Sequence, residues 1–204
     1  MIKVDNLVKG KKKNRYIVTL NGKEYDVDEN LIVTYHLVKG HIIDDDNVLD
    51  NIIDDMVYYD YYNIALNYIE KYIKSSGQVL EYLINKGANK TIASRVVFSL
   101  LDKRLIDDRK YLDMFIVHYI NLGYGPLYII NKAKTNKVSE DAINTIDFDK
   151  YYDTIKEQCI RIAKKKILSI KDDNLYIKKM KLLRFLYSRG YENDMSNIIV
   201  KELI

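Results

Sequence analysis

A pattern of apolar residues occurs three times between Leu80 and Leu203 of this 204-residue chain. Each copy has two apolar residues three positions apart, then a dipeptide that suits a helix end, then a second apolar stripe with helical spacing. The copies are Leu80, Leu83, Lys86-Gly87, Val96, Val97 and Leu100; Leu127, Ile130, Ala133-Lys134, Ala142, Ile143 and Ile146; and Leu183, Leu186, Arg189-Gly190, Ile198, Ile199 and Leu203. Recurrence of this kind predicts tandem helical repeats, and it favours a binding surface over a single active site.

Capping residues predict the helix boundaries of the first copy. Ser75 and Gln78 match a capping box, in which each side chain satisfies a free backbone N–H at the helix start. Gly87 suits the left-handed position that closes the helix. Asn89 or Thr91 would begin the next one.

Similar signals divide the other two copies. Asp107-Asp108 would cap a helix start, Gly123-Tyr124-Gly125 would interrupt the chain, and Pro126 suits the first turn of the following helix. A long helix over about 151–170 would open the last copy. The predicted three-helix repeats are residues 58–107, 108–150 and 151–204.

The N-terminal residues 1–57 predict a small β-structure with short helices. The runs 15–20 and 23–28 flank Asn21-Gly22, and this dipeptide between two strand-like runs is the strongest short hairpin signal. Residues 2–8 could add a strand, and short helices are expected near 31–37 and over 47–57. The predicted fold is therefore mainly α: three tandem three-helix repeats in an elongated curved array, with a small N-terminal β-hairpin extension.

The composition limits the cellular compartments in which we expect this protein to act. No apolar run approaches the roughly 20 residues of a membrane span, and the first residues lack the apolar region of a signal peptide. A single cysteine, Cys159, excludes an intramolecular disulfide and fits a reducing compartment. We expect a cytoplasmic monomer with no membrane contact.

The sequence offers no convincing catalytic or metal-binding constellation. Asp107 and Asp108 are adjacent, so they point in different directions on a helix, and residues 123–126 lack the Lys-Ser/Thr of a phosphate-binding P-loop. His36, His41 and His118 have no metal-ligand spacing with the cysteine. We expect no catalytic residue, no metal and no cofactor, and a function other than enzyme catalysis.

The distribution of charge is more informative than the net charge of +4. Residues 154–204 hold 12 Lys or Arg against 6 Asp or Glu, whereas residues 44–60 carry seven aspartates, including Asp45 and Asp46. The basic clusters could be solvated helix faces, could pair with an acidic protein surface, or could neutralise nucleic-acid phosphates. The candidate contact residues are Lys11, Lys12, Lys13, Arg15, Arg95, Arg161, Lys164, Lys165, Lys166, Arg184 and Arg189.

Four short motifs follow one another along the chain: Ala65-Leu66, Lys86-Gly87, Leu105-Ile106-Asp107-Asp108 and Gly123-Tyr124-Gly125-Pro126. This ordered set resembles the RecX family, the bacterial regulators of the recombinase RecA. The N-terminal hairpin followed by residues 37–40 is similar to the extension of low-GC Gram-positive members, and residues 182–203 are similar to the last repeat of the family. The chain departs from the family at Ser75-Ser76-Gly77, where many members carry a basic turn, and at Ala133-Lys134-Thr135, where a glycine usually closes the helix.

The resemblance implies three helical repeats in a crescent that binds within the groove of the RecA–DNA filament. It implies inhibition of ATP hydrolysis, strand exchange and co-protease activity, in recombination and the SOS response, and possible weak contact with single- or double-stranded DNA. The alternative is a DNA- or RNA-binding helical module unrelated to RecA, although no second helix carries the Arg, Asn and Gln run expected at base edges.

Overall fold

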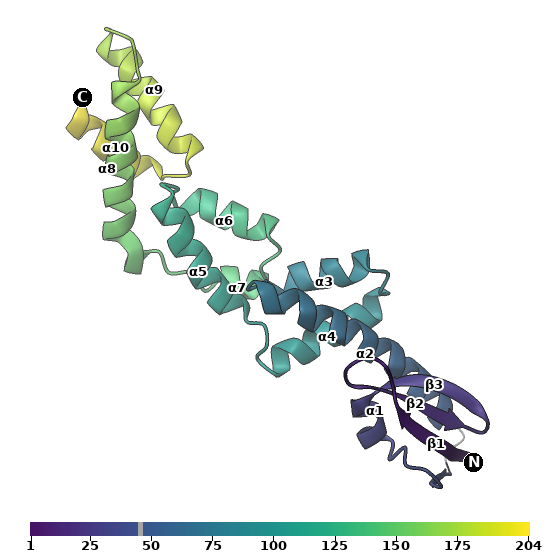
Figure 1. Cartoon of the computed structure of the whole chain (residues 1–204). Helices are drawn as coiled ribbons and strands as arrows, with labels where there is room; N and C mark the ends of the chain where they lie inside the picture. Colours follow the sequence, from purple (N-terminus) through teal and green to yellow (C-terminus); the bar gives the residue numbers. More distant parts are fainter. Residues whose placement is uncertain (45–46) are drawn as a thin grey trace. The chain divides into compact units, whose positions relative to one another are not determined.

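The computed structural model describes residues 1–44 and 47–204, so Asp45 and Asp46 of the acidic run lie outside the described residues (Figure 1). The fold is mainly helical, with a small antiparallel sheet at the N-terminus, as predicted. It divides into two compact units. The first comprises Met1–Tyr72 with Val79–Asp102, and the second comprises Ile73–Gln78 with Lys103–Ile204.

The N-terminal sheet has four strands in the order β3-β2-β1-β4: β1 (Ile2–Lys9), β2 (Arg15–Leu20), β3 (Lys23–Asp28) and β4 (Ile42–Ile43). The predicted hairpin is confirmed, since Asn21 and Gly22 join β2 to β3 with φ of 47° and 79°, as a type I′ turn requires. The predicted extra strand is also confirmed as β1, which pairs with β2. The two-residue β4, on the other side of β1, was not predicted because so short a strand has no periodicity.

One face of this sheet packs on α1 (Glu29–Thr34) and α2 (Val48–Lys71). Alternate strand residues such as Val4, Val18 and Val27 are fully buried there with Leu31 and Ile52. The prediction of a separate short helix over 47–57 is wrong, because α2 is one continuous helix of 24 residues. The predicted repeat boundary at residue 58 therefore falls inside α2.

The length of α2 follows from its two buried segments. Val48 and Ile52 pack against the sheet, whereas Tyr58, Tyr62 and Ala65 are buried further along the same helix, which also contacts α4. No glycine or proline interrupts the run between them, so the helix has no reason to break.

Three tandem three-helix repeats follow, as predicted. The remaining helices are α3 (Ser76–Asn85), α4 (Lys90–Asp102), α5 (Asp108–Asn121), α6 (Pro126–Thr135), α7 (Glu140–Ile143), α8 (Tyr152–Leu168), α9 (Leu175–Ser188) and α10 (Asn193–Leu203), with a 3-10 turn, η1 (Asp149–Tyr151), before α8. The predicted capping box is confirmed, since the Gln78 N–H donates to Ser75 Oγ and the Ser75 N–H donates to Gln78 Oε1, both at 3.2 Å. Asn89 caps α4, and Pro126 occupies the first turn of α6.

The three repeats are α2–α4, α5–α7 and α8–α10, and their middle helices, α3, α6 and α9, end in the same hydrogen-bonded turn. Gly87, Lys137 and Gly190 adopt positive φ of 99°, 57° and 81°. After each of them comes a buried residue whose N–H reaches back five residues: Ala88 to Leu83 O, Val138 to Ala133 O and Tyr191 to Leu186 O. This is the Schellman motif, which satisfies the last free carbonyl groups of a helix.

These turns correct the register of the sequence pattern. The apolar residues that the middle helices bury most deeply lie four positions apart, not three: Val79 and Leu83, Ile129 and Ala133, Leu182 and Leu186. In the second repeat, Ala133-Lys134 does not end the helix; Ala133 is in the core and Lys137 takes the left-handed position. A lysine in a position that usually needs glycine hid this turn from the sequence analysis.

The carboxylate of Asp108 joins the starts of three helices in the second unit. It accepts hydrogen bonds from the N–H and hydroxyl of Ser76, both at 2.7 Å, and from the Ser139 N–H at 3.0 Å. Asp108 is itself the first residue of α5, and its neighbour Asp107 caps that helix by accepting from the Arg109 and Lys110 N–H groups. Only 7% of Asp108 is exposed, so a buried anion lies where the positive ends of α3, α5 and α7 converge.

Successive middle helices also meet end to start within this unit. At the start of α3, the Ser75 hydroxyl donates to Asn136 O at 2.8 Å, just beyond the end of α6. At the start of α6, the Gly125 N–H donates to Arg189 O at 2.8 Å, beyond the end of α9. A Cβ atom on Gly77 or Gly125 would lie within 2.5 Å of the facing carbonyl oxygen, so both contacts require glycine.

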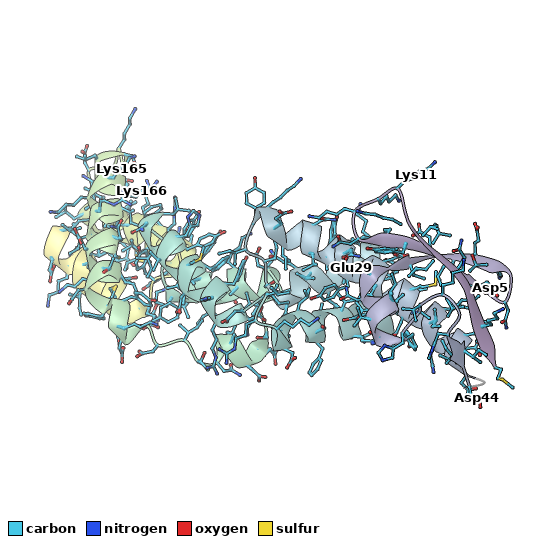
Figure 2. The ribbon with its side chains drawn as sticks, turned by 60° about the horizontal axis from the view of Figure 1, so that its bottom comes forward. Asp5, Lys11, Glu29, Asp44, Lys165 and Lys166 are labelled. Atoms are coloured by element: carbon cyan, nitrogen blue, oxygen red, sulfur yellow. The ribbon has the colours of Figure 1, made fainter. Side chains whose placement is uncertain are left out.

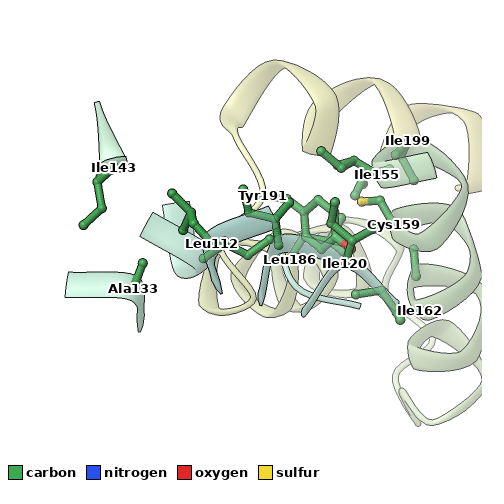
Figure 3. Packing of buried hydrophobic residues seen from close by; sticks show 14 of the residues in the cluster. Leu112, Ile120, Ala133, Ile143, Ile155, Cys159, Ile162, Leu186, Tyr191 and Ile199 are labelled. Carbon is green, nitrogen blue, oxygen red and sulfur yellow. The ribbon is translucent and has the colours of Figure 1, made fainter. Parts of the chain in front are cut away.

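The second and third repeats share one apolar core. Figure 3 shows side chains of α5, α8 and the α9–α10 segment meeting there, among them Ile120, Cys159, Leu186 and Tyr191. Tyr191, which follows the positive-φ Gly190, is 1% exposed at the centre of the cluster. No helix within residues 1–44 and 47–204 is both long and apolar enough to cross a membrane.

Replacement of Asp108 should destabilise the protein far more than replacement of Asp107. We expect Asp108→Ala to lower the free energy of unfolding by about 3 kcal/mol, because three donors lose a charged acceptor. Asp107→Ala removes only an exposed helix cap and should cost about 1 kcal/mol. Urea denaturation followed by circular dichroism measures both, and equal losses would contradict a junction role for Asp108.

Two glycines with nearly the same φ provide a second test. A Cβ on Gly190 would lie 2.2 Å from the Tyr128 nitrogen, whereas a Cβ on Gly22 would meet nothing within 4 Å. Gly190→Ala should therefore cost more than about 3 kcal/mol of unfolding free energy. Gly22→Ala carries only the left-handed backbone penalty of about 1 kcal/mol. Thermal unfolding of the two variants measures the difference between these losses of unfolding free energy. Equal losses would contradict a close contact between the end of α9 and the start of α6.

Candidate functional site

The motif-like residues of the sequence have structural roles in the fold. Asp107 and Asp108 cap and join helices, and Gly125 and Pro126 form the start of α6. Cys159 is fully buried, and burial raises the pKa of its thiol to about 12, so it stays protonated and is a poor nucleophile. Within the described part of the chain, no group of three or more His, Cys, Asp or Glu side chains could hold a metal ion.

Two of the candidate cations are neutralised inside the first unit. Arg15 donates to Asp26 at 2.8 Å and to Asp60 at 2.6 Å, and its side chain is only 15% exposed. Burial opposes the charge, but the hydrogen bonds and charges of the two carboxylates raise the pKa of Arg15 overall. Arg95 pairs with Asp55 at 2.7 Å and lies over the Tyr58 ring. These pairs also account for part of the acidic run.

Lys11, Lys12 and Lys13 lie in the turn between β1 and β2 and are exposed; Figure 2 labels Lys11. Gly10 and Arg15 close this turn by a backbone hydrogen bond of 2.8 Å. The structure therefore presents the three lysines together on one exposed loop.

Most of the C-terminal candidates come together between α8 and α9. Figure 2 labels Lys165 and Lys166 on α8. With Arg161 from the same helix and Arg189 from the end of α9, they line a hollow of about 360 Å³ whose apolar walls are Leu122 and Phe185. Arg161 is oriented by Gln158 Oε1 at 2.7 Å and by Asn121 O at 3.3 Å.

A second hollow of about 510 Å³ adjoins the first and shares Lys166, Ser169 and Phe185 with it. Arg184, Lys171 and Lys181 add positive charge to this hollow. Together the two hollows form one surface, which we call the α8–α9 groove. Every side chain of the groove belongs to the second compact unit.

The cations of the groove are mostly free of acidic neighbours. Neither hollow is lined by an Asp or Glu. Among the residues that the structure describes, Lys181 alone of the groove cations has a carboxylate within ion-pair distance, Asp172 at 2.9 Å. That hydrogen bond is the main cause that lowers the pKa of Asp172. The groove is therefore a region of uncompensated positive charge.

The aromatic side chains next to the groove hold two of its cations. Lys166 Nζ lies 5.4 Å from the centre of the Phe185 ring, and the Arg189 guanidinium lies 5.4 Å from the same ring and 4.7 Å from that of Tyr124. Tyr124 in turn stacks on Tyr128 at 3.9 Å. Such cation–π contacts orient the charges without neutralising them.

The sequence analysis found five of the groove cations and missed the rest of the surface. Lys164 is exposed on α8 but lines neither hollow. Lys171, Lys181 and Phe185 were not among the candidates, although Lys181, Arg184 and Phe185 have the spacing of one helix face. Leu122 comes from the end of α5, and no pattern within residues 154–204 could have revealed it.

Comparisons with known proteins agree with this architecture. The model of the third three-helix domain of RecX matches residues 154–200, which include most of the α8–α9 groove. The regulatory protein RecX of Clostridium perfringens is 29% identical over 181 residues, which cover 86% of this chain and 83% of that protein. The regulatory protein RecX of Leuconostoc mesenteroides is 26% identical over 206 residues, covering 100% of this chain and 77% of the relative.

Solved structures are similar in fold. A crystal structure of a regulatory protein RecX has a TM-score of 0.86 and 19% identity, and the match covers 98% of both chains. RecX from Lactobacillus salivarius has a TM-score of 0.61 over 72% of this chain and 96% of that one, at 22% identity. Along nearly its whole length this chain is therefore similar to proteins named regulatory protein RecX, and it shares the fold of the solved RecX structures.

Proposed function

We propose that this protein binds the RecA–DNA filament within its helical groove and modulates RecA, mainly by inhibition, in recombination and SOS DNA repair. The affected activities would be DNA-dependent ATP hydrolysis, strand exchange and co-protease activity. The observation that carries the proposal is the similarity to proteins named regulatory protein RecX along nearly the whole chain. The protein would act in the cytoplasm as a monomer, by binding and without catalysis.

The physical properties of the chain support such a role. Tandem repeats offer a long surface, along which weak contacts to neighbouring protomers sum to a useful affinity. A filament of protein and DNA offers both carboxylates and phosphates to exposed cations. We propose that the filament contacts are made by Lys11, Lys12, Lys13, Arg161, Lys164, Lys165, Lys166, Arg184 and Arg189. Arg15 and Arg95 are left out, because carboxylates of the first unit already hold them.

The first test is an ATPase titration of the cognate RecA on single-stranded DNA. We expect this protein to lower the steady-state rate at stoichiometric or lower amounts relative to RecA, because one bound regulator restrains several protomers. Filaments should be assembled before the protein is added. No inhibition up to a molar ratio of one would reject the proposal.

The order of addition separates this function from simple competition for DNA. A module that binds only naked DNA would inhibit strongly when added before RecA and weakly afterwards, and excess DNA would reverse its effect. A filament-binding regulator should inhibit preassembled filaments even when free DNA is added in excess.

A second test reverses charge on α8. The triple variant Lys164→Glu, Lys165→Glu and Lys166→Glu should require about tenfold more protein for half-maximal inhibition, which corresponds to roughly 1.4 kcal/mol of binding free energy. The matched control reverses three exposed lysines outside the candidate set, Lys39, Lys90 and Lys134. Circular dichroism should show unchanged helicity in both, and equal inhibition by the two variants would remove the α8 lysines from the interface.

A further inference from the structure

The α8–α9 groove has the shape of an extended site and not of a single pocket. Its two hollows, of about 360 and 510 Å³, share a wall made by Lys166, Ser169 and Phe185. Each hollow is large enough for a group the size of one nucleotide. A ligand that occupied both would therefore be a chain with at least two similar units.

Cations occupy each hollow separately. Lys165 and Arg189 line the first, Arg184 and Lys171 line the second, and Lys166 lies between them. None of these five has a carboxylate partner among residues 1–44 and 47–204. The ligand should then carry negative charge at regular intervals, because charge confined to one end would leave one set of cations unused.

The floor between the hollows is aromatic. Phe185 is half-buried, and cations on either helix, Lys166 and Arg189, lie 5.4 Å from its ring. A groove with backbone-tracking cations and an aromatic side chain is the usual solution for holding a single nucleic-acid strand, in which phosphates alternate with flat bases. An acidic peptide has carboxylates but no flat base at every backbone repeat to stack on an aromatic floor.

We propose that the α8–α9 groove binds a single strand of nucleic acid through successive phosphates, with a base near Phe185. In a RecA–DNA filament this strand would be DNA, so the biological setting rests on the proposed function. The binding itself needs no RecA, and its test uses the protein alone with a naked strand.

The probe is a fluorescein-labelled oligothymidylate of 20 nucleotides, and the readout is fluorescence anisotropy at several salt concentrations. The groove variant combines Lys165→Gln, Lys166→Gln and Arg184→Gln, which leaves the hydrogen bonds of Arg161 and the backbone contact of Arg189 intact. We expect at least a tenfold loss of affinity. The slope of log affinity against log salt should fall by about 2 in magnitude, since each phosphate contact contributes roughly 0.7 on a single strand.

The control variant, Lys39→Gln with Lys90→Gln and Lys134→Gln, removes the same charge from outside the groove. It should lose less than about threefold, which is the contribution expected of long-range attraction alone. Equal losses in the two triple variants would overturn the site. Phe185→Leu should weaken binding about fivefold with the salt slope unchanged, because it removes stacking and keeps the cations; Phe185→Tyr should bind as the unchanged protein does.

Competitors distinguish the source of the anion. Unlabelled oligothymidylate should displace the probe at nucleotide concentrations at which ATP, tripolyphosphate and polyglutamate do not. Displacement by ATP at equal concentration would make the groove a pocket for free nucleotides, and displacement by polyglutamate would make it a site for acidic protein. Either result overturns the strand assignment.

The same preparations separate this inference from the proposed function. If the unchanged protein fails to inhibit RecA but the groove variant loses the strand, the RecA role is rejected and the groove assignment stands. If RecA is inhibited while the groove variant binds the strand as well as the control does, the assignment is rejected and the RecA role stands.

Discussion

The second compact unit depends on a buried carboxylate at the meeting point of three helix starts. Asp108 receives hydrogen bonds from Ser76 and Ser139 and begins α5 itself. A buried charge is costly unless it is fully hydrogen-bonded, and here two of the donors are N–H groups that a helix start leaves free and the third is the Ser76 hydroxyl. One side chain of the first turn of α5 thus satisfies donors at the starts of α3 and α7 and holds the three helix starts together.

Hydrogen bonds between helix ends and helix starts also connect the middle helices. The helices α3, α6 and α9 each end in a Schellman turn, and in α6 and α9 a carbonyl group of that turn accepts a hydrogen bond from the start of the preceding middle helix: Ser75 donates to Asn136 O, and Gly125 donates to Arg189 O. One such junction lies between the end of α6 and the start of α3. Lys137 takes the left-handed position there with φ of 57°, and Gly77 leaves room for its carbonyl oxygen. The start of α9 has no glycine, and the Asn174 side chain caps it by accepting hydrogen bonds from the Tyr176 and Ile177 N–H groups.

Local signals in the sequence predicted the hairpin and the caps, because each depends on residues close in the chain: Asn21-Gly22, Ser75 with Gln78, and Pro126. The features that were missed depend on distant residues. α2 continues past residue 57 because one end packs on the sheet and the other in the first repeat. The turn at Lys137 lacks the glycine that would mark it, and Leu122 reaches the α8–α9 groove from α5. The charge pattern of the sequence predicted the candidate cations. Only the tertiary structure shows which of them pair with carboxylates and which do not.

The net charge of the chain is only +4, yet the basic C-terminal segment keeps cations that have no carboxylate partner among the described residues. A fold can pair its surface charges at little gain in free energy, since exposed ion pairs contribute at most about 1 kcal/mol. In the α8–α9 groove the nearby side chains are aromatic or apolar, and the cations gather on two facing helices despite their mutual repulsion. Repulsion within a cluster of free cations is an unfavourable term in the unbound protein that a polyanion relieves on binding. Binding of a polyanion is therefore favoured by the new contacts and also by the loss of the repulsion between the cations.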